Sequence, residues 1–405
     1  MKSIPRSLRP AFYLLGLLAF LALARDILAN SRPLWCKIGQ QSYWPGLRTL
    51  FTDPHKPYGV AVLDSLENTQ SWQRYPYDAA VFAPIPFSPG DFIRNPSVSL
   101  GKPGENHPGF PPGFRHWLGT DDNGRDVAAA IVAGARVAIL TGALAMVMAF
   151  GIGLFLGAIA GYFGDDRLRM PRGVALLNIL AIVLAMGYIL MIRREALLRH
   201  TDVPVSLDFG VLAGMVLLFN LLYCPLRYIP FFSQNVTLPA DLIIMRIAEV
   251  FNSIPRMIIL IVIASIAPAQ SLWVLIAVIG AMNWTGVAKF VRAELLRVRE
   301  LDYITAARGL GMPDWRNLLH HALPNALRPA LVAFAFGVAG AILLEASLTF
   351  LGFGGSDFKG VSWGSLLLTM KEHRTAWWVG LPAGLMITFT VLALNNIGDT
   401  LSKTR

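Results

Sequence analysis

The densest run of chemically capable side chains in the sequence is Asp121-Asp122-Asn123-Gly124-Arg125-Asp126. Carboxylate and amide oxygens at this density are the ligands that a calcium loop supplies. An EF-hand loop, however, needs a ligand where Arg125 stands and places its glycine elsewhere. We therefore interpret the run as a polar turn that leads into a helix.

Signatures of the common catalytic chemistries are missing from the sequence. It contains no G-x-x-x-x-G-K-[ST] phosphate loop, so we do not expect this chain to bind and hydrolyse ATP in that manner. It also lacks a Ser–His–Asp or zinc-hydrolase signature. His320 and His321 are adjacent, so their rings point to different helix faces and make a poor metal pair. His373, beside Glu372, is expected at an interface. We expect no enzymatic activity and no bound metal or cofactor.

The stretch 301–329 mixes helix formers and helix breakers in an order that predicts two short helices. Asp302 is a favourable N-cap for the first helix, and Gly309 and Gly311 interrupt it. The second helix begins with a proline in its first turn and ends at two further prolines, Pro324 and Pro329. From residue types alone, an ordinary basic cytoplasmic loop is an equally good interpretation.

Composition places these segments in a membrane. The chain has 405 residues, of which 55% are hydrophobic and 15% charged, whereas soluble domains carry about 25% charged residues. Several apolar runs reach the roughly 17–25 residues that a helix needs to cross hydrocarbon. The net charge of +10 lies mainly beside these runs, which is typical of cytoplasmic loops and excludes a nucleic-acid-binding domain. Cys36 and Cys224 lie far apart, and we do not expect them to pair.

We expect an all-α, polytopic membrane helical bundle with both chain ends inside. The predicted parts are a first transmembrane span (1–29), a long external loop (30–130), a second span (131–166), an inserted helical hairpin (167–240) and the remaining core spans (241–400), which include a cytoplasmic loop at 291–327. The basic residues before the first span also fit a cleaved signal peptide, but its apolar run is long for one. A long loop crosses the membrane regardless of its own charge.

Two spans have unusual features. The second is rich in glycine, and Gly153 with Gly157 forms a small-xxx-small pair that lets helices approach closely. The span at 241–266 carries charges in its first half, and Ser253-Ile254-Pro255 marks a break near the interface. The inserted hairpin, with apolar runs at 174–192 and 209–224, places Arg193 and Arg194 in an external link, against the positive-inside tendency.

The spacing within 301–329 resembles the "EAA" loop of binding-protein-dependent ABC importers. Ala306-Ala307, then Gly311, then Ala322-Leu323-Pro324 carry the resemblance, and the family's first Glu is Thr305 here. The amino-acid sequence of the loop is specifically similar to that of the dipeptide/oligopeptide permease branch. The resemblance implies a coupling helix that docks in a groove of an ATPase subunit. The implied coupling residues are Asp302, Tyr303, Thr305, Ala306, Ala307, Gly309, Gly311, Leu323 and Pro324.

Three further places resemble the same branch. The first is the entry to the second span, 116–127, and the second is Gly134-Ala135-Arg136, which follows at the expected distance. The third is the outer segment between the last two spans, 347–354 with Trp363-Gly364. The implied outer-face and gate residues are Gly119, Thr120, Asp121, Gly124, Arg125, Asp126, Leu351, Gly352 and Gly354. Within this branch the chain most resembles the C-type subunit of microcin/oligopeptide importers, because its external loop is so long. The insert at 167–240 departs from the pattern.

The resemblance implies a type I ABC importer permease fold with six core spans plus the inserted two-span hairpin, in a bacterial inner membrane. It also implies a second homologous permease subunit, two ATP-binding-cassette ATPases that use ATP and Mg, and an external solute-binding protein that delivers peptides or related solutes. Two alternatives stay open: a secondary transporter that works without an ATPase, and a membrane scaffold with an external binding domain. The first would need inverted repeats and intramembrane ionisable sites, of which only Glu345 and Glu249 are candidates.

Overall fold

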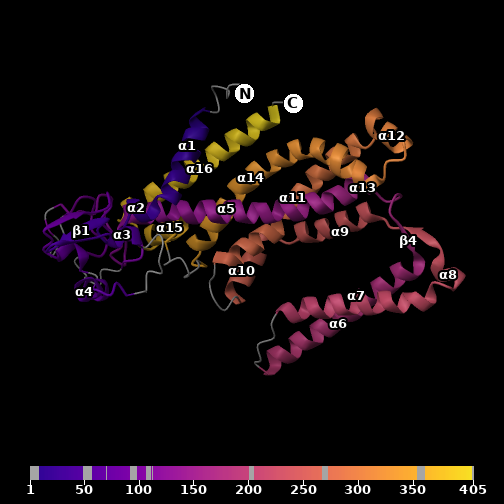
Figure 1. Ribbon diagram of the computed structural model, residues 1–405, viewed down its shortest axis with the longest axis horizontal. Helices are drawn as coiled ribbons and strands as arrows, with labels where there is room; N and C mark the ends of the chain where they lie inside the picture. The colour runs from indigo at the N-terminus through magenta and orange to yellow at the C-terminus, as the bar shows by residue number, and fades with distance from the viewer. Residues whose placement is uncertain are drawn as a thin grey trace. The chain divides into compact units, whose positions relative to one another are not determined.

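The computed structural model describes residues 9–48, 57–69, 71–91, 98–105, 111, 113–199, 205–266, 272–353 and 361–403. It divides into two compact units, which are described separately: Met1–Gly157 with Ala248–Arg405, and Ala158–Ile247. The structure is mostly helical, as predicted for a membrane helical bundle (Figure 1). Short strands occur in both units and were not predicted.

Six described helices are long and apolar enough to cross a membrane: Val127–Phe163, Arg172–Ala196, Ser206–Leu226, Leu272–Val298, Asp314–Phe350 and Trp377–Lys403. A seventh candidate is a bent pair, Ala240–Ser253 with Arg256–Ser265, whose axes differ by 74°. The bend falls at the predicted break, because Pro255 cannot continue the hydrogen-bond ladder of the preceding helix. Arg9–Leu23 is a shorter apolar helix of 15 residues.

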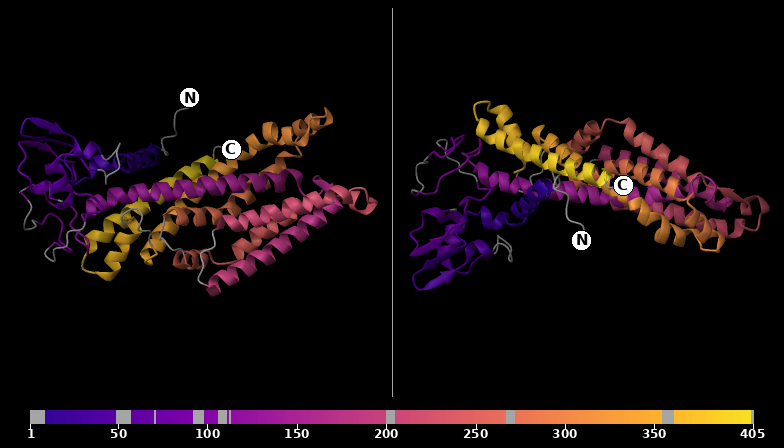
Figure 2. Two further views of the ribbon diagram at one scale, coloured as in Figure 1. Left: turned by 60° about the horizontal axis from the view of Figure 1, so that its bottom comes forward. Right: turned by 90° about the horizontal axis from the view of Figure 1, so that it is seen from above.

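The first unit contains most of the long helices. Its helical elements are α1 (Arg9–Leu23), α2 (Arg25–Leu28), α3 (Pro45–Arg48), α4 (Ala61–Thr69), η1 (Trp72–Arg74), α5 (Val127–Ala158), α10 (Arg256–Ile266), α11 (Leu272–Val298), α12 (Asp302–Gly309), α13 (Asp314–Asn317), η3 (Leu318–Ala322), α14 (Leu323–Phe350), α15 (Trp363–Glu372) and α16 (Trp377–Lys403). Figure 2 shows α14 and α16 side by side from two further directions.

Small side chains allow close helix packing in this unit. A Cβ atom added at Gly153 would lie 2.6 Å from the carbonyl oxygen of Trp284 on α11. One at Gly157 would lie 2.6 Å from the carbonyl oxygen of Ala288. The predicted small-xxx-small contact is therefore confirmed, with α11 as the partner helix. Helix α15 is joined to α5 by Trp363, whose indole Nε1 donates to the carbonyl of Ile131 at 3.0 Å.

The segment after α2 folds on itself. Strands β1 (Trp35–Ile38), β2 (Gln41–Tyr43) and β3 (Ala79–Val81) form an antiparallel sheet in the order β2-β1-β3. A small apolar cluster, Leu63, Leu66 and Trp72, packs against residues of this sheet. An Arg32–Glu67 ion pair links the segment before β1 to α4. Cys36 is buried and Cys224 exposed, and both are free thiols as expected.

The second unit is a helical hairpin with a short stem. It contains η2 (Ile159–Phe163), β4 (Arg169–Pro171), α6 (Arg172–Arg199), α7 (Val205–Leu226), α8 (Pro230–Ser233), β5 (Asn235–Thr237) and the first half of α9 (Ala240–Ser253). Strands β4 and β5 pair antiparallel and hold the two ends of the hairpin together. Asn220 donates to Asn178 at 2.7 Å between α6 and α7.

Several predicted boundaries differ from the structure. Helix α6 continues through the expected polar link to Arg199, and Arg193 pairs there with Asp208 of α7. This pair compensates one of the cations that conflicted with the positive-inside tendency. The predicted cytoplasmic loop 291–327 starts within α11 and ends within α14. The interhelical segment is thus shorter than predicted, because α11 continues to Val298 and α14 already begins at Leu323.

Candidate coupling site

The segment between α11 and α14 has the predicted order of short helix, glycine turn and second helix. Helix α12 ends in a Schellman motif: the amide of Met312 donates to Ala307 at 3.1 Å and that of Gly311 to Arg308 at 2.9 Å. Gly311 has φ +82°, the left-handed conformation that this position requires. Gly309 is an ordinary helical residue. Asp302 is the first residue of α12 and makes no capping bond, so its predicted N-cap role was wrong.

Buried contacts fix α12 against the helix that follows. Ile304 is fully buried, and the fully buried side chain of Asn317 donates from Nδ2 to the carbonyl of Ile304 at 3.1 Å. Arg308 Nε lies 3.3 Å from Asp314 Oδ1, which adds an ion pair across the turn. Asn317 was not among the predicted site residues. An asparagine directly before an apolar stripe was the available signal, but its partner is a backbone carbonyl.

The opposite side of this segment is exposed and partly apolar. Most of the predicted coupling residues lie on it: Asp302, Tyr303, Thr305, Ala306, Gly309, Gly311 and Pro324 are exposed, whereas Ala307 and Leu323 are half-buried. Leu310 is 89% exposed, although a leucine in a folded core would be covered. Trp315 and Leu319 are exposed beside it. A rigid, apolar, exposed helix pair is suited to helix-in-groove recognition by another protein.

The outer-face run, residues 116–127, contains a hydrogen-bonded turn before α5, as expected. Asp121 Oδ1 accepts from the amides of Asn123 at 2.9 Å and Arg125 at 2.8 Å. Gly124 has φ +71°, which completes the turn. Asp126 Oδ1 accepts from the amide of Ala129 at 2.7 Å, so this carboxylate caps the N-terminus of α5.

The run is docked on the last two helices. The indole Nε1 of Trp378 on α16 donates to the carbonyl of Thr120 at 3.3 Å. A Cβ at Gly119 would lie 2.4 Å from the carbonyl oxygen of Gly101 and 2.9 Å from the Trp378 ring, so no side chain fits there. Thr120 is fully buried and accepts from the amide of Gly101 at 2.8 Å.

Burial changes the acid–base behaviour of this turn. Burial raises the pKa of Asp121 to about 6, although Arg125 and the backbone hydrogen bonds act in the opposite direction. A second buried group, His116, was not among the predicted site residues. His116 Nδ1 lies 2.8 Å from Asp126 Oδ2, and its ring stacks on Phe87 with centroids 3.9 Å apart.

The other predicted outer-face residues lie at the far end of α14. Leu351 and Gly352 follow its last residue, and Gly352 has φ +90°. The amides of Gly352 and Phe353 donate to Thr349 and Leu348 at 3.0 and 2.9 Å, a second Schellman motif. Gly354 lies outside the described residues. Glu345, one turn before the end of α14, is 2% exposed.

Several named proteins are similar to this chain in sequence. Residues 234–403 match the family model of the binding-protein-dependent transport system inner membrane component. A putative peptide transport system permease protein of Brucella suis is 31% identical over 314 residues, which are 76% of this chain and 80% of that protein. The peptidoglycan transport system permease protein YejE of Agrobacterium fabrum is 26% identical and covers 96% of this chain and 86% of its own length.

A third relative, the inner membrane ABC transporter permease protein YejE of Escherichia coli, is 26% identical over 94% of this chain and 87% of its own length. These similarities extend over most of the chain, and the family model covers the coupling segment and the last two long helices. The chain therefore belongs to the family of binding-protein-dependent transport system inner membrane components: it is a multi-pass permease of an ABC transporter, not an enzyme, and it works with ATPase and binding-protein partners.

Proposed function

We propose that this chain is one of a non-identical pair of permease subunits that import peptides or related solutes. The cargo class rests on the names of the relatives, which include peptide and peptidoglycan transport permeases. Two ATPase subunits close on ATP and Mg, and a solute-binding protein delivers cargo at the outer face. The permease chain itself holds no nucleotide or metal for this cycle.

The proposed coupling surface is the exposed side of 302–319. Its helices are fixed by Ile304 and Asn317, so a push from an ATPase would be transmitted to α11 and α14 rather than absorbed by a flexible loop. These two long helices are continuous with the segment on either side. The exposed Leu310 is the observation that carries this assignment.

The orientation follows from charge. Basic residues gather around the coupling segment, which favours the cytoplasm: Lys289, Arg292, Arg297, Arg299, Arg308, Arg316 and Arg328. In this orientation α14 leads to the outer face and α16 returns, so we propose that the C-terminus lies inside. Helix α1 contacts α16 in the same unit, and we propose that the N-terminus lies inside as well.

The test is co-purification of the full chain with its ATPases from a mild detergent. Leu310→Glu places a charge at the proposed contact without touching a buried residue, and we expect loss of the ATPase from the complex and of ATP-driven uptake. Trp117→Glu is the matched control, because Trp117 is also exposed (66%) but lies in the outer-face run. Retention of the ATPase by Leu310→Glu, or purification of the wild-type chain without any ATPase, would contradict the proposal.

A further inference from the structure

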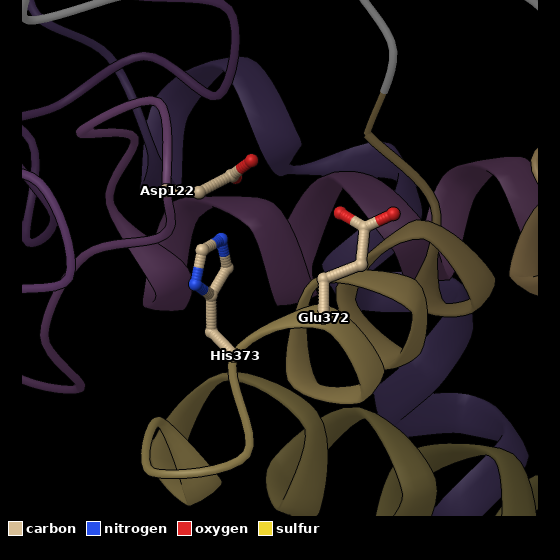
Figure 3. Close-up of side chains that lie close together, drawn as sticks. All are labelled: Asp122, Glu372 and His373. Atoms are coloured by element: carbon tan, nitrogen blue, oxygen red, sulfur yellow. The ribbon is translucent and has the colours of Figure 1, made fainter.

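Three metal-ligating side chains meet where the outer-face run lies against the end of α15. Asp122, Glu372 and His373 each offer one ligand atom, and these atoms all lie within 4.8 Å of one another. Figure 3 shows the imidazole and the two carboxylates around one space between the loop and the helix. Asp122 and His373 are half-buried and Glu372 is exposed, so a cation from the solvent can reach this space.

The residues come from segments about 250 positions apart, and the fold sets their placement. On α15, Thr369 precedes Glu372 and His373 by three and four residues, so all three share one helix face. Thr369 Oγ1 donates to Asp122 Oδ1 at 3.4 Å, and Asn123 Nδ2 donates to the same oxygen at 2.9 Å. Among the described residues no hydrogen bond is recorded for the second carboxylate oxygen of Asp122, which leaves it available for coordination.

The backbone of His373 is also fixed. It terminates α15, its amide donates to the carbonyl of Thr369 at 2.8 Å, and its own carbonyl accepts from Ala376 at 2.9 Å. A ligand on a well-defined helix end needs only a side-chain rotation to close on a cation. This lowers the entropic cost of ordering the ligand when a metal binds.

We propose that Asp122, Glu372 and His373 form a divalent transition-metal site, with Zn²⁺ as the preferred ion. Two carboxylates alone would suit Ca²⁺ or Mg²⁺, but the imidazole favours a borderline metal such as Zn²⁺. Three protein ligands leave a coordination position for water. The bound ion joins the run that precedes α5 to the end of α15.

The proposal predicts stoichiometric binding to the purified full chain in detergent. We expect one Zn²⁺ per chain by isothermal titration after chelator treatment, and Mg²⁺ at millimolar concentration should not displace it. His373→Ala should weaken binding at least tenfold. His320→Ala is the matched control, since this exposed histidine lies on the coupling segment and should leave the affinity unchanged.

A second variant tests the positioning by Thr369. Loss of a hydrogen-bond partner of a metal ligand typically lowers the metal affinity about 10–100-fold. Thr369→Val should therefore weaken Zn²⁺ binding about tenfold, and Thr369→Ser should restore it. Co²⁺ provides a spectroscopic readout, because its absorption bands should change in His373→Ala and not in His320→Ala.

Folding is checked separately by thermal unfolding of each variant without metal, which should match the wild-type chain. Absence of saturable Zn²⁺ binding to the wild-type chain would overturn the proposal. Equal Zn²⁺ affinity in the wild-type chain and in a folded double variant His373→Ala, Glu372→Gln would overturn it as well. Neither result would affect the assignment of the coupling surface, which shares no residue with this site.

Discussion

Two glycines of the coupling segment differ in conformation although they are separated by one residue. Gly311 has φ +82° at the C′ position of a Schellman motif, whereas Gly309 is the last residue of α12 with ordinary helical geometry. Within the described part of the chain, no neighbouring atom lies within 4 Å of a Cβ added at either glycine. Any effect of a substitution here therefore comes from the backbone rather than from a clash.

Gly311→Ala should reduce ATP-driven uptake, because an L residue in the left-handed region costs about 1–2 kcal/mol and would reorient α12 against α13. Gly309→Ala should reduce uptake less than Gly311→Ala does, because alanine is favourable at a helical position and leaves the backbone of α12 unchanged. Uptake per assembled complex is the measurement, with co-purified ATPase as the check on assembly. Undiminished uptake by the Gly311 variant would count against the role given to this segment.

The buried carboxyl of Asp121 gives the outer-face run a pH dependence. Its pKa is raised to about 6, so the native state binds a proton more tightly than the unfolded chain does. The contribution of Asp121 to stability is then fully present below about pH 4, the ordinary range of an aspartate, and is lost as the pH rises through 6.

Asp121→Asn should remove this dependence while its side-chain oxygen still accepts from Asn123 and Arg125. We expect the unfolding temperature of the wild-type chain to fall by a few degrees more between pH 4.5 and pH 7.5 than that of the variant, which corresponds to about 2 kcal/mol. Thermal unfolding in detergent at the two pH values is the measurement. Parallel curves for the two proteins would show that Asp121 is not the titrating group.

At the scale of elements, the packing of α5 on α11 depends on which face of α5 each glycine occupies. Gly153 is buried against the α11 backbone, whereas Gly151 is exposed with no atom within 4 Å of an added Cβ. The amino-acid composition of α5 does not distinguish the two glycines. The packing of α5 against α11 does.

Gly153→Leu should separate the two helices and lower the yield of folded, monodisperse protein, because overpacking costs about 1–3 kcal/mol or more. Gly151→Leu should be tolerated, since its side chain would face outward. Size-exclusion profiles and thermal unfolding of the two variants provide the comparison. Similar destabilisation by both would indicate that glycine lowers strain within α5 itself rather than at its interface.

At the scale of the whole molecule, the inserted hairpin is a compact unit with a closed stem. Pro171 pairs with Asn235 at the end of the β4–β5 ladder, so the chain enters and leaves α6–α8 at neighbouring positions. An insertion with adjacent ends places little geometric demand on the flanking chain.

We expect that replacing 172–234 by a two-residue Asn-Gly turn leaves the first unit folded and the ATPase attached. The β4–β5 pair would then become a simple hairpin, a geometry that this turn favours. Expression, co-purification and uptake of the shortened chain are the measurements. Failure of the shortened chain to insert or to retain the ATPase would show that the hairpin is needed for the core permease.

The sequence by itself determined the membrane class, the family, and the order of helix, glycine turn and helix in the coupling segment. These features depend on local composition, on glycine and proline, and on spacing, all of which are readable along the chain. The break at Pro255 and the turn before α5 were predictable for the same reason. Helix ends were not: prolines at 324 and 329 suggested a boundary, yet α14 continues through both.

The tertiary structure decided what depends on partners distant in the chain. Asn317 matters because it meets the carbonyl of Ile304, and Gly119 because Trp378 occupies the space of a side chain. His373 appeared interfacial in the sequence, and only the docking of the outer-face run on α15 brings Asp122 beside it. Helix packing between remote segments creates such sites, and periodicity within a single segment carries no information about it.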